Sequence, residues 1–200
     1  MKSKAFAIAV LLMATSFSPA QAAPNYAFPV VGCDYTYAKA HHDYPATDIL
    51  AKAGCKYVAV TSGVIDEVNR VDSWSGKTNL GVDRGGLYVS FIGSDGVRYY
   101  ASHLRTIPLS IQPGVEVKAG RLLGTVGATG SARGTKPHIH FGLSWSTPPQ
   151  TWWVRRGMVW PGKYLDAWKA GKDLSPAKEV EAKRLKTGDL PPEPVNEKRK

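Results

Sequence analysis

The stretch GLYVSFIGSDGVRYYAS, residues 86–102, indicates how this chain folds. Its two halves, GLYVSFIG (86–93) and VRYYAS (97–102), are rich in the aromatic and β-branched residues that favour strands. Between them stands SDG, and an Asp-Gly step between two apolar runs is a strong signal for a tight β-hairpin. The stretch therefore predicts two neighbouring antiparallel strands.

Further short strands are predicted on both sides of this hairpin. KYVAVTSGVIDEVNRV (56–71) is rich in Val and Ile, and its Gly63 can mark a turn or a bulge. GVEVKAG and RLLGTVGATGSARG follow the hairpin, and HIHFGLSW (138–145) follows them. Short strands at regular spacing with Gly-rich turns favour an all-β fold, a small antiparallel sheet, sandwich or barrel. One short helix is expected at Tyr164–Ala170, and the sequence contains no internal repeat.

Two segments near the C-terminus differ from this pattern. Residues 145–168 hold five of the six tryptophans, which could line a binding groove or form a strap whose rings pack on the sheet. We favour the strap, so that residues 24–170 form one domain with a Trp-rich C-terminal strap. Residues 175–200 are charged, contain proline and hold few large apolar groups, which predicts a disordered or loosely docked tail.

The first residues predict export. Lys2 and Lys4 precede an apolar run at residues 5–17, and small residues up to Ala22 complete a secretory signal peptide over residues 1–22. The run is well short of the roughly 20 apolar residues that a membrane anchor needs, and no later stretch is long and apolar enough to span a bilayer. We therefore expect an exported protein of the periplasm, the cell wall or the extracellular space.

The chain carries a formal charge of +10 at pH 7, to which the signal segment contributes two lysines and no acid, so +8 is left for the exported part. Anionic polymers of the cell wall are plausible partners of a basic exported protein, although such a charge can also serve solubility alone. The sequence shows no nucleic-acid-binding motif, so nucleic acid is not expected as a partner.

The chain has two cysteines, Cys33 and Cys55, which flank the segment HHDYPATDIL (41–50). An even pair in an exported protein suggests a disulfide bond. Closing a loop of this size adds about 3 kcal/mol in the chain-entropy model. Metal ligation by the two thiolates is the alternative, but zinc sites of that kind use closely spaced cysteines, which this sequence lacks.

Two histidines, His138 and His140, stand two residues apart in HIHFG. Alternate residues of a strand point to the same face, so both rings are expected to project together. HHDYPATDIL supplies a second polar cluster, with two adjacent histidines and Asp48. One histidine and Asp48 from this segment, with one histidine from HIHFG, would give the three protein ligands of a catalytic zinc site.

Such a site lowers the pKa of its bound water to about 7 and suits hydrolysis at neutral pH. The nitrogen ligands favour zinc over calcium, which prefers oxygen. His103 stands at the end of the strand 97–102, from where it could reach the same cleft. Histidines that do not bind the metal can orient or deprotonate the water, or stabilise an oxyanion. The alternative for HHDYPATDIL is a polar turn at Pro45 with Asp48 as a cap.

Three blocks, HHDYPATDI, YYASHL and PHIHFG, occur in this order along the chain. Together with the connecting GVEVKAGRLLGTVGATGSARGTKPHIHF, they resemble the lysostaphin-type, or LytM-like, zinc endopeptidases over about residues 28–146. The resemblance implies a small antiparallel β-fold with an active-site groove and a lipoyl-like hairpin before the H-x-H strand. It also implies one zinc ion per chain and cleavage of peptide bonds in bacterial peptidoglycan.

The site residues that the resemblance implies are metal ligands at His42, Asp48 and His140 and catalytic histidines at His103 and His138. The family commonly spaces its first ligand histidine and its aspartate as H-x-x-x-D, whereas here five residues separate His42 from Asp48. His41 is one residue further away, so we expect it beside the ligands or at the surface.

The resemblance thus implies a zinc metallopeptidase that hydrolyses peptide bonds in peptidoglycan stem peptides or cross-links, with zinc-bound water and two catalytic histidines. All five positions are filled, which favours an enzyme over a catalytically weak wall-binding or amidase-activating protein of the same fold. A D,D-carboxypeptidase with similar zinc chemistry is a further alternative. Glycine bridges and D-Ala–diaminopimelate links are both compatible substrates.

Overall fold

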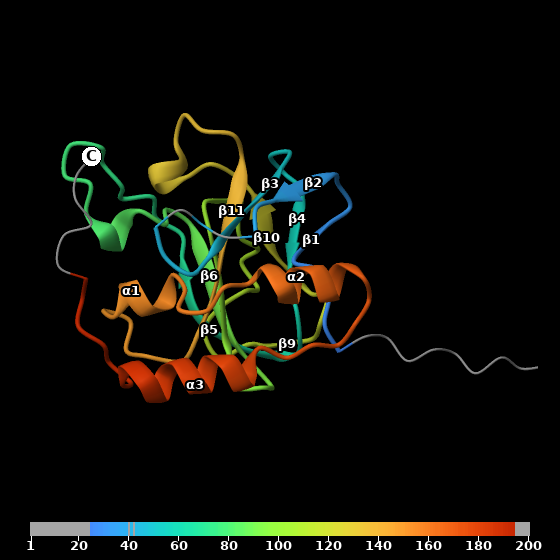
Figure 1. Cartoon of the computed structure of the whole chain (residues 1–200). Helices are drawn as coiled ribbons and strands as arrows, with labels where there is room; N and C mark the ends of the chain where they lie inside the picture. The colour runs from blue at the N-terminus through green and yellow to red at the C-terminus, as the bar shows by residue number, and fades with distance from the viewer. Residues whose placement is uncertain (1–24, 40, 42, 195–200) are drawn as a thin grey trace, which may run out of the picture.

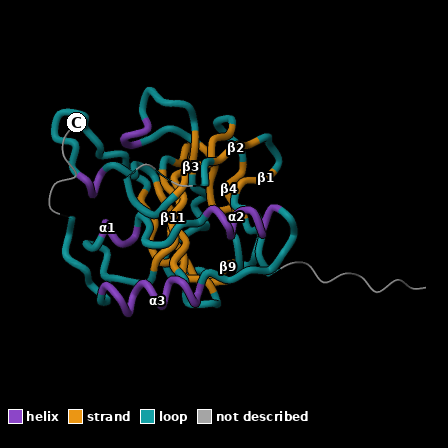
Figure 2. The backbone as a smooth tube through the Cα atoms, in the orientation of Figure 1, coloured by secondary structure: helices purple, strands orange, loops and turns teal. Residues whose placement is uncertain are grey.

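The computed structural model describes residues 25–39, 41 and 43–194, and their strands form two antiparallel sheets (Figures 1 and 2). The larger sheet has seven strands in the order β2-β3-β11-β7-β6-β5-β9. They are β2 (Tyr35–Tyr37), β3 (Thr47–Ala51), β5 (Gly63–Asn69), β6 (Tyr88–Gly93), β7 (Arg98–Ser102), β9 (Glu116–Val117) and β11 (His138–Ser144). The smaller sheet, β1-β4-β10-β8, consists of β1 (Val30–Val31), β4 (Lys56–Val58), β10 (Leu122–Val126) and β8 (Leu104–Thr106). The predicted antiparallel β-fold with little helix is confirmed.

The predicted hairpin is confirmed as β6 and β7. Gly93 N–H donates to the carbonyl of Val97 at 2.8 Å, and Gly96 in the turn has φ 78°, which glycine adopts without steric cost. Phe91 and Tyr99 lie opposite each other and are fully buried. The hairpin therefore combines a local turn signal with apolar side chains of the core, and β7 places its other edge against β11.

Between β7 and β8, the chain passes from the larger to the smaller sheet within a single residue, His103. Strand β7 ends at Ser102 and strand β8 begins at Leu104. His103 has φ 64°, a left-handed conformation that costs a residue other than glycine about 1–2 kcal/mol. Such a conformation persists only where the surrounding structure determines it, as the junction of the two sheets does here.

The segment before β11 differs from the lipoyl-like hairpin that the resemblance implies. Strand β9 pairs with β5 of the larger sheet, whereas β10 pairs with β4 and β8 of the smaller sheet. The two strands therefore belong to different sheets and are not the two arms of one ladder. Both runs carry the same apolar and Gly-rich signals, and a sequence pattern does not say which partner each strand takes.

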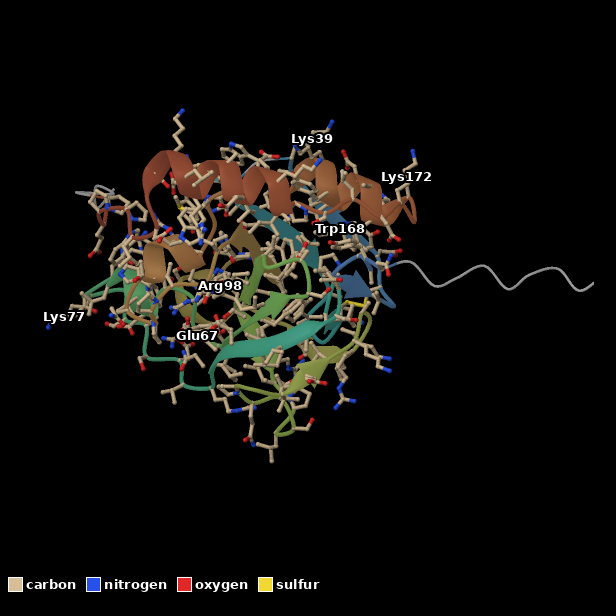
Figure 3. All side chains as sticks on the ribbon, turned by 90° about the horizontal axis from the view of Figure 1, so that it is seen from below. Lys39, Glu67, Lys77, Arg98, Trp168 and Lys172 are labelled. Carbon is tan, nitrogen blue, oxygen red and sulfur yellow. A yellow bond between two sulfur atoms is a disulfide. The ribbon has the colours of Figure 1, made fainter. Side chains whose placement is uncertain are left out.

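In the described part of the chain, three helices accompany the sheets: α1 (Trp152–Arg155), α2 (Gly162–Lys169) and α3 (Ala177–Thr187), with short 3-10 turns η1 (Gly81–Asp83) and η2 (Gly130–Ala132). Helix α2 confirms the short helix expected at 164–170. Figure 3 shows α2 and α3 together on one side of the strands, with Trp168 pointing from α2 toward them. The Trp168 ring stacks on Tyr26 at 5.5 Å and meets Phe141 edge-on at 6.3 Å, so α2 is fixed by aromatic packing.

The tail, which was expected to be disordered or loosely docked over residues 175–200, contains a helix that contacts the rest of the domain. Residues up to 194 are described, and 177–187 of them form α3, with Val180 buried. The indole N–H of Trp145 donates to the carbonyl of Asp189 at 2.8 Å, and that of Trp153 donates to the carbonyl of Pro191 at 2.9 Å. Composition does not predict this docking, because the bonds use backbone carbonyls of the tail. Only one apolar side chain of α3 is buried.

The Trp-rich segment fulfils both roles that its sequence allows. Trp145 and Trp168 are buried against the sheets, as expected of a strap. Trp152 instead lines the groove described below, and Trp160 is 41% exposed. The tryptophans of this segment are thus divided between the interior, the groove and the surface, and the strap stays a prediction.

The predicted disulfide between Cys33 and Cys55 is present. It closes the loop that carries β2 and β3, and Cys55 directly precedes β4. Among the described residues, no helix is both long and apolar enough to cross a membrane. The predicted signal peptide, residues 1–22, lies outside the described residues.

Candidate metal centre and groove

Three adjacent strands bring the predicted site residues together. Asp48 of β3 lies directly opposite His140 of β11, and Ser102 of β7 lies opposite His140 on the other side. Directly opposed residues of an antiparallel pair share a face, and His138 is two residues before His140 on the same strand. Strand register alone therefore places Asp48, His138 and His140 on one face, at the end where β7 gives way to His103.

His140 lies between two hydrogen-bond acceptors. Its Nε2 is 2.9 Å from the backbone carbonyl of Arg156, and its Nδ1 is 3.1 Å from Oδ1 of Asp48. A carbonyl oxygen only accepts, so Nε2 carries a proton, and the Nδ1 lone pair of a neutral ring then faces a carboxylate. A metal cation, or a second ring proton, removes this conflict. Nδ1 of His140 and Oδ1 of Asp48 therefore suit a shared metal ion as their partner.

His41 completes the cluster among the described residues. Its Nε2 is 3.9 Å from Oδ2 of Asp48, and its ring centroid is 5.1 Å from that of His140. One ligand atom from each of the three residues lies within 4.8 Å of the others, which allows a shared ion. Two nitrogens and one oxygen match a zinc site with three protein ligands. His42, the ligand implied by the resemblance, lies outside the described residues, so its role stays a prediction.

The carboxyl of Asp48 is ionised at neutral pH. Burial alone would raise its pKa, but the hydrogen bond with His140 and the nearby rings of His138 and His41 outweigh burial and lower the pKa to about 2. A carboxylate is the form that binds metal. Asp48 is therefore ready to act as a ligand over the whole neutral range.

His103 is held by both its backbone and its ring. Its N–H donates to the carbonyl of Gly85 at 2.9 Å, and its Nδ1 donates to the carbonyl of Thr129 at 2.8 Å. Burial, together with the neighbouring rings of His140 and His138, lowers the pKa of His103 to about 3. The ring is therefore neutral at pH 7, with its proton on Nδ1 and a lone pair on Nε2.

His138 has the same arrangement. Its Nδ1 donates to the carbonyl of Lys136 at 2.7 Å, which leaves a lone pair on Nε2. Its ring centroid is 4.9 Å from that of His103. The two predicted catalytic histidines thus lie side by side, next to the cluster of His41, Asp48 and His140, and none of their contacts uses a carboxylate of the cluster.

The four described histidines open into one groove of about 590 Å³. Its aromatic lining includes Trp74 and Trp152, and its cationic lining consists of Arg84, Lys136, Arg155 and Arg156. Sequence analysis offered the segment 145–168, which holds Trp152, Arg155 and Arg156, as a possible groove lining, but it did not identify Trp74, Arg84 or Lys136. Trp74 is the one tryptophan outside 145–168, within a polar loop between two strands, and this isolated position was the available signal.

Two contacts fix the walls of the groove. In one wall Arg133 pairs with Asp72 at 2.7 Å, and its guanidinium lies over the Trp74 ring at 5.6 Å. In the other wall the guanidinium of Arg156 stacks on Tyr44 at 3.7 Å, while its carbonyl orients His140. Arg156 therefore links the groove surface to the metal cluster.

Comparison with known families identifies the class of protein. The model of peptidase family M23 matches residues 42–151, more than half of the chain. The chain therefore belongs to peptidase family M23, as the resemblance to lysostaphin-type enzymes implied. A comparison with curated proteins found no significant match.

Similar solved structures include lysostaphin, whose fold agrees with this assignment. The antimicrobial peptidase lysostaphin from Staphylococcus simulans is 25% identical, with a TM-score of 0.51 over 72% of this chain and 55% of that chain. Its catalytic domain alone gives 26% identity and a TM-score of 0.49 over 66% and 92% of the two chains. The catalytic domain of the prophage-encoded M23 protein EnpA from Enterococcus faecalis, solved as a point mutant, is 24% identical. Its TM-score is 0.46 over 62% of this chain and 89% of that chain. The chain thus spans about half of full-length lysostaphin.

Proposed function

We propose that this protein is an exported zinc endopeptidase that hydrolyses peptide bonds in the stem peptides or cross-links of bacterial peptidoglycan. The observation that carries the proposal is the shared groove, in which a His-Asp-His cluster lies beside His103 and His138. Membership in family M23 supports a peptidase, and the similarity to lysostaphin, an antimicrobial peptidase, supports a bacterial target.

The metal would be held by Asp48, His140 and one histidine of HHDYPATDIL. The described geometry favours His41, because its Nε2 faces Asp48. Binding through Nε2 requires the ring proton on Nδ1, so the long 3.3 Å contact from the N–H of Asp43 to this atom must open. The spacing of the family favours His42 instead. Bound zinc supplies a Lewis acid that acidifies water and polarises a carbonyl.

His103 and His138 act on the reacting groups. Each ring offers an Nε2 lone pair, so each can accept a hydrogen bond from the attacking water and orient it. When protonated, the same atom can donate to the oxyanion that forms on the substrate carbonyl or to the leaving amine. The carbonyls of Thr129 and Lys136 hold the rings in place during these exchanges.

The groove lining suits a peptide of the cell wall. Its tryptophans offer flat apolar surfaces, and its arginines and lysine can pair with the carboxylates of stem peptides. Export, which such a substrate requires, is supported by the disulfide and by the predicted signal peptide. Periplasm, cell wall and extracellular space are all compatible with this proposal.

Digestion of purified peptidoglycan by the exported form, followed by mass spectrometry of the fragments, tests the proposal. New amino and carboxyl termini inside a cross-link are expected, and they disappear when Asp48 is replaced by alanine. Release of single terminal amino acids would identify a carboxypeptidase. Unaltered peptidoglycan, bound but not cut, would identify a wall-binding or amidase-activating protein.

A further inference from the structure

Thr129 connects the three segments that surround His103. Its carbonyl accepts the Nδ1–H of His103 at 2.8 Å. Its hydroxyl accepts the N–H of Leu87 at 3.0 Å and donates to the carbonyl of Leu104 at 2.9 Å. One residue thus bonds to the ring of His103, to the residue that follows His103, and to the start of β6.

The segments on both sides of these bonds have little room to shift. A side chain at Gly86 would place its Cβ 2.4 Å from the backbone nitrogen of Gly130, and the N–H of Ser131 donates to the carbonyl of Arg84 at 2.9 Å. Backbone therefore packs directly on backbone beside Thr129. The carbonyl of Gly85, the residue before Gly86, accepts the backbone N–H of His103.

The Thr129 hydroxyl uses its single proton and a lone pair in these bonds, which fixes its rotamer. Without the hydroxyl, the N–H of Leu87 and the carbonyl of Leu104 lose a partner in a partly buried place, which is unfavourable. Thr129 would then lose two of the bonds that hold it, and its carbonyl would no longer be fixed on Nδ1 of His103. The ring could then carry its proton on either nitrogen.

We infer that Thr129 is a positioning residue that holds His103 in the tautomer with the proton on Nδ1. Nε2 of the neutral ring then carries the lone pair that accepts a hydrogen bond from the attacking water in the groove. The catalytic consequence rests on the proposed function, whereas the tautomer itself does not. Thr129 therefore acts through His103 and needs no contact with substrate or metal.

Three variants test this inference. Thr129→Val removes the hydroxyl at nearly constant volume, and Thr129→Ser retains it. Thr106→Val is the matched control, because it removes a threonine hydroxyl that bonds only to Thr125 on the exposed side of β8 and β10. Thr129→Ala, which also lacks the hydroxyl, replaces the valine variant if that one does not fold.

The first readout is the histidine tautomer, measured in metal-free protein by two-bond ¹⁵N–¹H NMR with His103 assigned by substitution. Wild type, Thr129→Ser and Thr106→Val should show only Nδ1–H at His103, whereas Thr129→Val should show both tautomers. The second readout is peptidoglycan hydrolysis. Loss of a group that orients a functional histidine typically costs 10–100-fold in activity, so kcat of Thr129→Val should fall by about this factor. KM and zinc content should stay as in wild type.

A merely structural role would lower the melting temperature of Thr129→Val without moving the tautomer or separating kcat from KM. A single Nδ1–H tautomer and wild-type kcat in Thr129→Val would overturn the inference, as would an equal loss in Thr129→Ser. A tautomer shift in Thr129→Val, in a protein whose wild type cuts no peptidoglycan, would support the positioning role and contradict the proposed enzyme.

Discussion

At the scale of single residues, backbone carbonyls decide what each histidine can do. The three histidines with a carbonyl partner are His103 with Thr129, His138 with Lys136 and His140 with Arg156. The bond lies at Nδ1 in the first two and at Nε2 in the third. The free nitrogen of His140 therefore faces Asp48, whereas those of the other two are free for substrate or water. This difference supports the proposed roles of His140 as a ligand and of His138, on the same strand, as a catalytic histidine.

The two adjacent histidines of HHDYPATDIL are alternative zinc ligands, and the two alternatives predict opposite effects of substitution. If His41 is the ligand, as its distance to Asp48 suggests, His41→Ala should lose zinc and His42→Ala should keep it, because three ligands provide most of the affinity. Elemental analysis of the two purified variants measures this. The reverse result would assign the ligand to His42, in agreement with the family spacing.

Removal of a catalytic histidine should separate metal binding from activity. His103→Ala and His138→Ala should keep about one zinc per chain, because neither ring belongs to the cluster. Peptidoglycan hydrolysis should fall by about 10²–10³-fold, the usual loss when a group that stabilises developing charge is removed. His140→Ala is the control that should lose zinc. Zinc loss in His138→Ala but not in His140→Ala would exchange the two roles.

At the scale of elements, strand β3, which carries Asp48, could not be predicted from the sequence, whereas the hairpin could. GLYVSFIG and VRYYAS are long enough to show apolar strand residues around a turn. TDILA, the sequence of β3, is short and follows a proline, and its aspartate suits a turn as well as a strand. Its place beside β11 depends on a long-range register that local pattern does not contain. The choice between His41 and His42 was open for the same reason.

Helix α3 should stabilise the fold through one buried side chain. Val180→Asp places a charge in a site that is 4% exposed, so the free energy of unfolding should fall by about 1–3 kcal/mol. Leu185→Asp in the same helix is the control, since Leu185 is 75% exposed and its replacement should change stability by less than about 0.5 kcal/mol. Urea unfolding measures both. Equal stability of Val180→Asp and wild type would show that α3 does not dock.

The disulfide should stabilise the segment that carries the cluster. The double variant Cys33→Ser, Cys55→Ser should lose about 2–5 kcal/mol, the usual effect in a small exported domain. Thermal unfolding with and without reductant checks this. Reductant should lower the melting temperature of wild type and leave that of the double variant unchanged. A double variant as stable as wild type would mean that the sheets alone hold β2 and β3.

At the scale of the whole molecule, the site lies where the two sheets meet. The chain crosses between them at His103, and the bridge between Gly127 and His138 links the end of β10 to the start of β11. A Cβ at Gly127 would lie 2.7 Å from the carbonyl oxygen of His103, so only glycine allows this approach. Strand content could be predicted from the sequence, but this junction could not, because it depends on backbone contacts between distant segments.

The central claim is that one metal ion in this cluster makes the groove a peptidase, and reconstitution tests it most directly. Metal-free protein is titrated with zinc while the cleavage of peptide bonds in purified peptidoglycan is measured. Activity should rise linearly and stop at one zinc per chain, and Asp48→Ala should stay inactive throughout. Hydrolysis by fully metal-free protein, or no hydrolysis after one equivalent of zinc is bound, would contradict the account.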